Sequence, residues 1–181
     1  MKDNTMRFFL ALFLALSAAL PMAHAGEVGS PIPNLLTSVD QHENDQSFDT
    51  LRGENGVALF FVRSVDWCPY CKRQVIDVAS RYEAFRDAGY EVVVISYDSP
   101  AKTRAFAQEH DIPFLLLSDE QSEIINSFSI LDTSQEADSR FFGIPKPTIF
   151  VVDETGRVSA KFAENDYRQR PDLDVVIKSL K

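Results

Sequence analysis

The feature that most constrains the fold is the hexapeptide at residues 67–72, Trp-Cys-Pro-Tyr-Cys-Lys, which contains both cysteines and the single tryptophan. Residues 57–62 before it form an unbroken apolar, β-branched and aromatic run, which is typical of a buried strand. After it, apolar residues recur at helical spacing: Cys71, Val75, Val78, Ala79, Tyr82 and Phe85. The cysteine pair therefore lies where a strand turns into a helix N-terminus, whose free N–H groups and dipole stabilise a thiolate.

The first 25 residues have the features of a secretory signal. Lys2 and Arg7 precede an apolar run at residues 8–20, and Ala23-His24-Ala25 gives a small-X-small cleavage pattern before Gly26. The run is shorter than the roughly 20 residues that a membrane-spanning helix needs. We therefore predict a cleaved signal at residues 1–25 and no stable membrane insertion afterwards. The mature protein would be exported, into the periplasm of a Gram-negative source or otherwise secreted.

The remaining chain has the length of one domain, which we divide into an N-terminal segment at residues 26–56 and a domain at residues 57–181. The full chain has a net charge of -9, and loss of the signal would leave -10. Such acidity argues against nucleic acid as a partner. A disulfide across two residues would close a very short loop and restrain the unfolded chain little, so the pair is better suited to chemistry than to stability.

The rest of the chain alternates between strand and helix patterns. We expect strands at 57–63, 91–96, 114–117, 148–152 and 157–162, and helices at 69–88, 100–110, after a capping box formed by Ser118 and Gln121, and from 171 onward. Residues 26–56 are expected to be irregular apart from one short strand. This order predicts an α/β fold in which helices cover both faces of one mixed central sheet.

Two landmarks resemble the thioredoxin superfamily. Trp-Cys-X-X-Cys-Lys at a strand-to-helix junction resembles thioredoxin, and Cys-Pro-Tyr-Cys resembles the glutaredoxin active-site turn. Residues 144–148, Ile-Pro-Lys-Pro-Thr, resemble the loop that carries the cis-proline of the thioredoxin-like fold. The resemblance implies that Pro147 is this cis-proline, that Lys146 offers its backbone to a bound thiol or peptide, and that Thr148 enters the following strand.

A resemblance to the alkyl hydroperoxide reductase/thiol-specific antioxidant family, a peroxiredoxin-like redoxin family, covers nearly the whole mature chain. It rests on residues 60–64, 92–100, 117–119 and 150–153 with Gly156. The family's peroxidatic motif, Pro-X-X-X-Thr-X-X-Cys, implies that Ser64 takes the Pro position, Cys68 the Thr position and Cys71 that of the peroxidatic Cys. The family's peroxide-polarising Arg would fall at Pro147.

The first functional hypothesis is an exported thiol-disulfide oxidoreductase that cycles between a Cys68–Cys71 disulfide and the dithiol. Cys68 would be the exposed nucleophile at the helix N-terminus, and Cys71, one turn inside, would resolve the mixed disulfide. Pro69 restricts the turn, and Tyr70 adds bulk beside the sulfurs. Trp67 is expected to be a packing and docking surface. Charges that could tune the pair are Arg63, Asp66 and Lys72.

Two alternatives stay open. In a thiol-dependent peroxidase, peroxide would oxidise Cys71 to a sulfenic acid, and Cys68 would condense with it; Arg63 or Lys146 would replace the missing Arg. A non-catalytic binding module is the second alternative, although both cysteines argue against it. Expected partners are protein or small-molecule thiols and disulfides, or peroxides under the first alternative. We expect no bound cofactor and no metal, because two cysteines provide half of a structural zinc site.

Overall fold

The computed structural model describes residues 26–33 and 38–180, so the predicted signal peptide at residues 1–25 lies outside the described residues. The elements are, in chain order, β1 (Ser38–Asp40), β2 (Asp45–Gln46), α1 (Phe48–Leu51), β3 (Gly56–Phe61), α2 (Pro69–Ser80), α3 (Tyr82–Asp87), β4 (Tyr90–Ser96), α4 (Pro100–Glu109), β5 (Leu115–Ser118), α5 (Glu123–Ser127), β6 (Thr148–Asp153), β7 (Val158–Ala163) and α6 (Leu173–Lys178).

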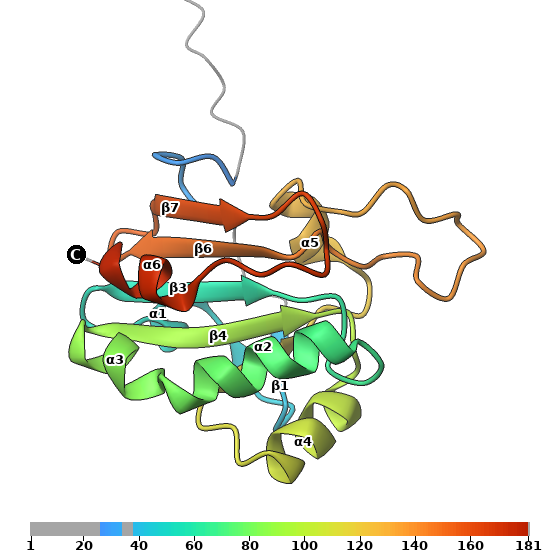
Figure 1. The fold of residues 1–181 in the computed structure, drawn as a ribbon, viewed down its shortest axis with the longest axis horizontal. Helices are drawn as coiled ribbons and strands as arrows, with labels where there is room; N and C mark the ends of the chain where they lie inside the picture. Colours follow the sequence, from blue (N-terminus) through green and yellow to red (C-terminus); the bar gives the residue numbers. More distant parts are fainter. Residues whose placement is uncertain (1–25, 34–37, 181) are drawn as a thin grey trace, which may run out of the picture.

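Seven of these elements form one mixed sheet in the order β2-β1-β5-β4-β3-β6-β7 (Figure 1). Strands β3, β4 and β5 are parallel, whereas β6 pairs antiparallel with β3 and β7 antiparallel with β6. The central position of β3 explains its unbroken apolar sequence, because a strand covered on both faces has no solvent side. The predicted mixed α/β fold is confirmed.

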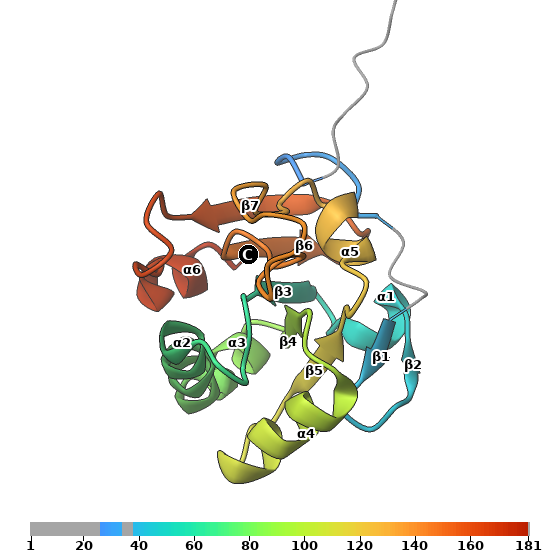
Figure 2. The same cartoon turned by 90° about the vertical axis from the view of Figure 1, so that its right-hand side faces the viewer.

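Side-chain alternation along β3 divides the core into two layers. Ala58 and Phe60 point into one hydrophobic cluster, and Val57, Leu59 and Phe61 point into the other. The first cluster includes apolar side chains of α2, α3, α4 and α6, and the second includes those of α1 and α5. Figure 2 shows the sheet nearly edge-on, with α2, α3 and α6 on one side and α1 and α5 on the other.

Gly56 at the start of β3 illustrates how closely the central strands approach one another. Its φ is +138°, and a Cβ built there would lie 1.9 Å from the carbonyl oxygen of Val152 on β6. Only glycine can adopt this backbone without a clash. The residue therefore fixes the register of β3 against β6, in which Phe61 pairs with Thr148 at the opposite end.

Two helix boundaries differ from the expectations. The helix predicted over 69–88 is divided into α2 and α3 at Arg81, whose φ of −114° and ψ of 8° are not helical. The capping box predicted for Ser118 and Gln121 is wrong. Instead, the carboxylate of Asp119 accepts the N–H groups of Ile124 (3.2 Å) and Ile125 (2.8 Å) at the start of α5.

The N-terminal segment contains more regular structure than predicted: two short strands and α1 in place of one strand. In the described parts, 26–33 and 38–180, no helix has the length and apolar character needed to cross a bilayer.

A buried carboxylate organises the β1–β2 hairpin. Asp40 is 1% exposed and accepts the N–H groups of His42 (2.7 Å) and Asn44 (3.0 Å) and the side-chain amide of Gln46 (2.7 Å). Burial acts to raise its pKa, but the hydrogen bonds outweigh burial and hold the pKa of Asp40 below its usual value. The charged form is therefore the one that the folded hairpin prefers.

We predict that Asp40→Asn lowers the free energy of unfolding at pH 7 by about 1–2 kcal/mol, because an amide cannot accept all these bonds. Because the folded pKa is depressed, the stabilisation by the wild-type carboxylate exists above the unfolded pKa of about 3.9 and disappears as the pH falls through the folded pKa. Urea unfolding at pH 7 and pH 3 should therefore show a difference that shrinks in acid. Asp45→Asn, an exposed change in the same hairpin, is the control; a difference that stays constant with pH would contradict the prediction.

Candidate active site

Cys68 and Cys71 form a disulfide at the N-terminus of α2, with their Cα atoms 5.3 Å apart. Cys68 is the N-cap residue, Pro69 is the first helical residue, and the Cys68 sulfur accepts the N–H of Cys71 at 3.3 Å. This bond uses one of the free N–H groups of the helix, so the N-terminus stabilises negative charge on Cys68. The strand-to-helix position inferred from the sequence is confirmed.

Both cysteines are buried, which differs from the expected exposed nucleophile. Cys68 is 1% and Cys71 0% exposed, and both belong to the hydrophobic cluster under α2. Trp67 and Tyr70 pack against the same cluster. A reactant therefore reaches the sulfurs only past the surrounding side chains.

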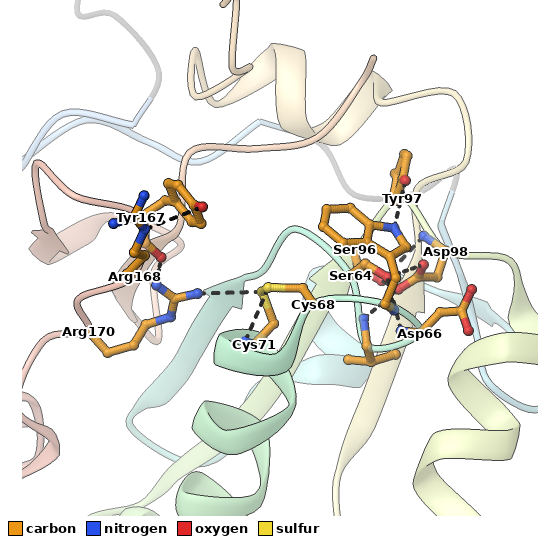
Figure 3. The surroundings of a disulfide bond; sticks show 12 residues. Ser64, Asp66, Cys68, Cys71, Ser96, Tyr97, Asp98, Tyr167, Arg168 and Arg170 are labelled. Carbon is orange, nitrogen blue, oxygen red and sulfur yellow. Dashed lines mark hydrogen bonds between the residues drawn. A yellow bond between two sulfur atoms is a disulfide. The ribbon is translucent and has the colours of Figure 1, made fainter. Parts of the chain in front are cut away.

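The loop between β3 and α2 is held by a buried carboxylate from the end of β4. Asp98 accepts the Ser64 hydroxyl (2.8 Å), the Val65 N–H (2.7 Å) and the Ser96 hydroxyl (2.9 Å), and it is 2% exposed. Ser64 Oγ in turn accepts the N–H groups of Asp66 (2.9 Å) and Trp67 (3.2 Å). The Asp98–Ser64 anchor thus satisfies the backbone of the loop that delivers Cys68 (Figure 3).

Trp67 packs among aromatic residues on the Cys68 side of the pair. Its ring lies 4.7 Å from the Phe141 ring, and its Nε1–H donates to the Tyr97 hydroxyl at 2.9 Å. Phe142, which follows Phe141 in the chain, is 52% exposed. Trp67 is therefore fixed by packing and a hydrogen bond.

A guanidinium group that the sequence analysis missed lies on the other side of the pair. The Nη2 of Arg170 is 3.4 Å from the sulfur of Cys71, and its Nη1 donates to the carbonyl groups of Gln169 (2.7 Å) and Tyr167. Figure 3 shows Arg170 reaching the sulfur from the segment between β7 and α6. The two partners are 99 positions apart in the chain, which explains why no local pattern indicated this contact. The only signal is a basic stretch just before Pro171.

The positive charge at this position is poorly compensated. Burial, followed by repulsion from Arg63 and Arg73, lowers the pKa of Arg170 to about 10. The Nε atoms of Arg170 and Arg63 are buried and make no hydrogen bond to any residue that the structure describes. The guanidinium of Arg63 instead lies 4.2 Å from the Tyr167 ring centroid and 5.4 Å from that of Trp67. The guanidinium groups of Arg170 and Arg63 therefore provide oriented hydrogen-bond donors for an anion near Cys71.

The other predicted tuning charges contribute less. Asp66 forms an ion pair with Lys102 at 2.8 Å, which offsets its charge, and hydrogen bonding to Asp66 raises the pKa of Lys102. Lys72 begins the second turn of α2, where its N–H donates to the carbonyl of Cys68 at 3.0 Å, and its side chain is half-buried.

The predicted cis conformation of Pro147 is wrong, because no peptide bond in the described residues is cis. An antiparallel bridge between Leu131 and Pro145 sets the path of this loop. The Lys146 N–H donates to the carbonyl of Ile130 at 2.7 Å, and the Lys146 carbonyl accepts the Thr148 hydroxyl at 2.9 Å. The backbone of Lys146 is thus already engaged within the protein, and its N–H is not offered to a bound peptide.

The candidate site therefore consists of the disulfide, the Asp98–Ser64 anchor, the aromatic group around Trp67 and the arginines beside Cys71. The described residues contain no group of three or more His, Cys, Asp or Glu side chains that could hold a metal ion.

Comparison with known proteins agrees with this fold. Solved structures with the same fold include peroxidoxin BcpB from Mycobacterium tuberculosis, with a TM-score of 0.70, 22% identity, and coverage of 87% of this chain and 96% of that one. A peroxiredoxin-like protein from Aquifex aeolicus superposes with a TM-score of 0.71 at 18% identity, covering 86% of each chain. These likenesses establish the fold class, a thioredoxin-like fold of the peroxiredoxin type.

The family model described as "AhpC/TSA family" matches residues 28–161, and the chain belongs to this family. The chloroplastic peroxiredoxin Q of Gentiana triflora is 31% identical over 150 residues, which cover 82% of this chain and 64% of that protein. Peroxiredoxin Bcp of Bacillus subtilis is 27% identical over 132 residues, covering 73% of this chain and 82% of that protein. The matched part is thus less than two thirds of the length of the Gentiana protein. The predicted family is confirmed.

We predict that Ser64→Ala lowers the free energy of unfolding by about 1–3 kcal/mol, because it removes one donor to a buried carboxylate and the acceptor of two N–H groups. Urea unfolding of the oxidised protein measures this change. Ser80→Ala is the control, because the Ser80 hydroxyl is bonded only to the Asp77 carbonyl at an exposed position; its effect should stay within about 0.5 kcal/mol. Equal effects of the two substitutions would contradict the anchoring role of Ser64.

Proposed function

We propose that this protein is an exported thiol-dependent peroxidase in which Cys71 is the peroxidatic and Cys68 the resolving cysteine. The observation that carries the proposal is the contact between Arg170 and the sulfur of Cys71, at 3.4 Å. In a dithiol exchanger the stabilised thiolate would be Cys68, whereas this guanidinium lies on the second cysteine. The names of the relatives, peroxiredoxin Q and peroxiredoxin Bcp, support peroxidase chemistry.

The proposed reaction begins with the Cys71 thiolate. It attacks one peroxide oxygen, the O–O bond breaks, and the leaving alkoxide or hydroxide takes a proton from water. Arg170 stabilises the thiolate and the negative charge that develops on the leaving oxygen. The guanidinium fork is suited to this task, because it presents several fixed donors and keeps its charge near neutral pH. Cys71 is left as a sulfenic acid.

Resolution uses the geometry of the first turn of α2. The Cys68 thiolate attacks the Cys71 sulfur, hydroxide leaves and becomes water, and the disulfide forms. The two cysteines are close enough to bond within one helical turn, so this step needs no unfolding of the helix. The pair has then supplied two electrons to the peroxide, and two external thiol groups must return them.

A dithiol-disulfide exchanger remains the second candidate, because the helix N-terminus favours negative charge on Cys68, as an attacking or leaving thiolate requires. The two candidates differ in which sulfur reacts first. Export is part of the proposal on sequence grounds only: the basic start, the apolar run and the small-X-small site of residues 1–25 support it.

The first test compares hydrogen peroxide reactivity of the reduced wild type with Cys68→Ser and Cys71→Ser. We expect Cys71→Ser to abolish the reaction, whereas Cys68→Ser reacts once and accumulates a sulfenic acid that dimedone traps at Cys71. Stopped-flow fluorescence of Trp67, the only tryptophan, follows the reaction, and mass spectrometry locates the adduct. Retained reactivity in Cys71→Ser together with its loss in Cys68→Ser would overturn the assignment in favour of the exchanger.

The second test concerns the guanidinium. Arg170→Gln should lower the rate constant for peroxide on the order of 100-fold, as expected when a fixed electrostatic donor is removed. Stability should change little, because the buried charge of Arg170 is repelled by its neighbours. Arg170→Lys should recover only part of the rate, since a point charge does not reproduce the planar fork. Arg157→Gln, a change remote from the pair, is the matched control, and an unchanged rate in Arg170→Gln would exclude the proposed role.

A further inference from the structure

Positive charge is concentrated beside Cys71 although the chain as a whole is acidic, with a net charge of -9. Four arginines are grouped there: Arg63, Arg73, Arg168 and Arg170. Within residues 26–33 and 38–180, none of the four forms a salt bridge to a carboxylate within 4.0 Å. Their neighbours are aromatic rings instead: the Arg73 guanidinium lies 4.8 Å from the Tyr70 ring centroid, and that of Arg168 lies 5.4 Å from Tyr167. Such a group attracts anions, and the nearby carboxylates of Asp166 and Asp77 offset only part of its charge.

A cavity of about 330 Å³ lies between α2 and residues 168–173, and three of the four arginines line it. Its lining includes Tyr70, Arg73, Gln74, Asp77, Arg168 and Arg170. Arg170 therefore lines the cavity and also contacts the Cys71 sulfur. The volume is at the lower end of the range for small-molecule sites, so the cavity suits a ligand smaller than a typical drug. Cys71 is 0% exposed and does not line the cavity, so the reactive atom of such a ligand has to approach the sulfur past Arg170.

The cavity also contains acceptors. The side-chain oxygen of Gln74 is buried without a hydrogen-bond partner among the described residues, and Gln74 is only 8% exposed. Asp77 adds a carboxylate at the same wall. Three guanidinium groups with two acceptors match a molecule that carries carboxylates together with N–H groups, as an amino-acid or peptide thiol does.

We propose that this cavity binds the reductant: a small peptide or amino-acid thiol whose carboxylate pairs with Arg73 and Arg168. The inference rests on the proposed function, since it supplies the two electrons that the Cys68–Cys71 disulfide needs after each turnover. The structure contains the disulfide, which is the state that a reductant meets.

The exchange step follows from the arrangement. The thiolate of the reductant attacks the Cys71 sulfur from the arginine side, the Cys68–Cys71 bond breaks, and Cys68 leaves as a thiolate. The N–H of Cys71 already donates to the Cys68 sulfur, which makes it a good leaving group. A second reductant thiolate then attacks the sulfur of the first, which releases a reductant disulfide and the Cys71 thiolate. Two thiols are oxidised, and the protein disulfide gains two electrons.

The test measures reduction of the oxidised full-length mature protein by single thiols, without peroxide, through the fluorescence of Trp67. The protein is oxidised beforehand with diamide. The probes are 3-mercaptopropionate (anionic), 2-mercaptoethanol (neutral), cysteamine (cationic) and glutathione, each compared per thiolate. At low salt we expect the two carboxylate thiols to react about tenfold faster than 2-mercaptoethanol and cysteamine to be the slowest, with the differences decreasing as salt is added. S-methylglutathione should inhibit reduction by 2-mercaptoethanol.

Substitutions distinguish a specific binding site for carboxylate thiols from nonspecific electrostatic attraction of anions. Arg73→Gln with Arg168→Gln should reduce the preference for carboxylate thiols to below about threefold, whereas Arg52→Gln with Arg157→Gln, an equal charge change elsewhere, should leave it intact. Equal rates for all thiols in the wild type, a preference that survives in the double variant, or no inhibition by S-methylglutathione would each overturn the proposal. Because no peroxide is present, the result is independent of peroxidase activity: an inactive peroxidase that still prefers carboxylate thiols would refute the proposed function alone.

Discussion

The site depends above all on one buried carboxylate, Asp98, which holds the loop between β3 and α2. The loop leaves the centre of the sheet and must start a helix seven residues later, in a region where water does not satisfy its backbone. Asp98 and Ser64 take part in five hydrogen bonds: one joins them to each other, and the other four come from the backbone of the loop and from Ser96. The start of α2, and with it the position of both sulfurs, therefore depends on a side chain at the end of a different strand.

Electrostatics gives the two sulfurs different environments within a single helical turn. Cys68 accepts an N–H at the helix N-terminus, and Cys71 contacts a guanidinium from the far end of the chain. Both interactions favour thiolate over thiol. The helix N-terminus is part of the thioredoxin-like fold itself, whereas the Arg170 contact is an additional interaction from a separate segment. A thioredoxin-like fold with the N-terminus alone is suited to exchange through the first cysteine. In our proposal, the additional cation favours the thiolate of the second cysteine, so this cysteine is the one that reacts first with peroxide.

The sequence predicts those structural features that depend on local residue patterns. The strand at 56–61 and the start of α2 follow from periodicity, and the pairing of Cys68 with Cys71 follows from their spacing. The break at Arg81 was missed because apolar spacing continues across it, and Asp119 was missed as a cap because Ser118 and Gln121 offered a familiar local pattern. Arg170 could not be predicted, because its contact with Cys71 depends on the course of residues 164–172 from β7 across the sheet edge.

The absence of the motif's Arg from its expected position and the omission of Arg170 have one physical origin. Alignment to a family motif assigns a role to a position in the chain, but a thiolate responds only to a charge in space. The motif leaves Cys71 without its Arg, because Pro147 occupies that position. The fold supplies a guanidinium from a segment that no motif covers, at 3.4 Å from the same sulfur. Since the stabilisation of a thiolate depends on distance and burial and not on sequence position, a cation from either segment can lower the barrier for attack on a peroxide.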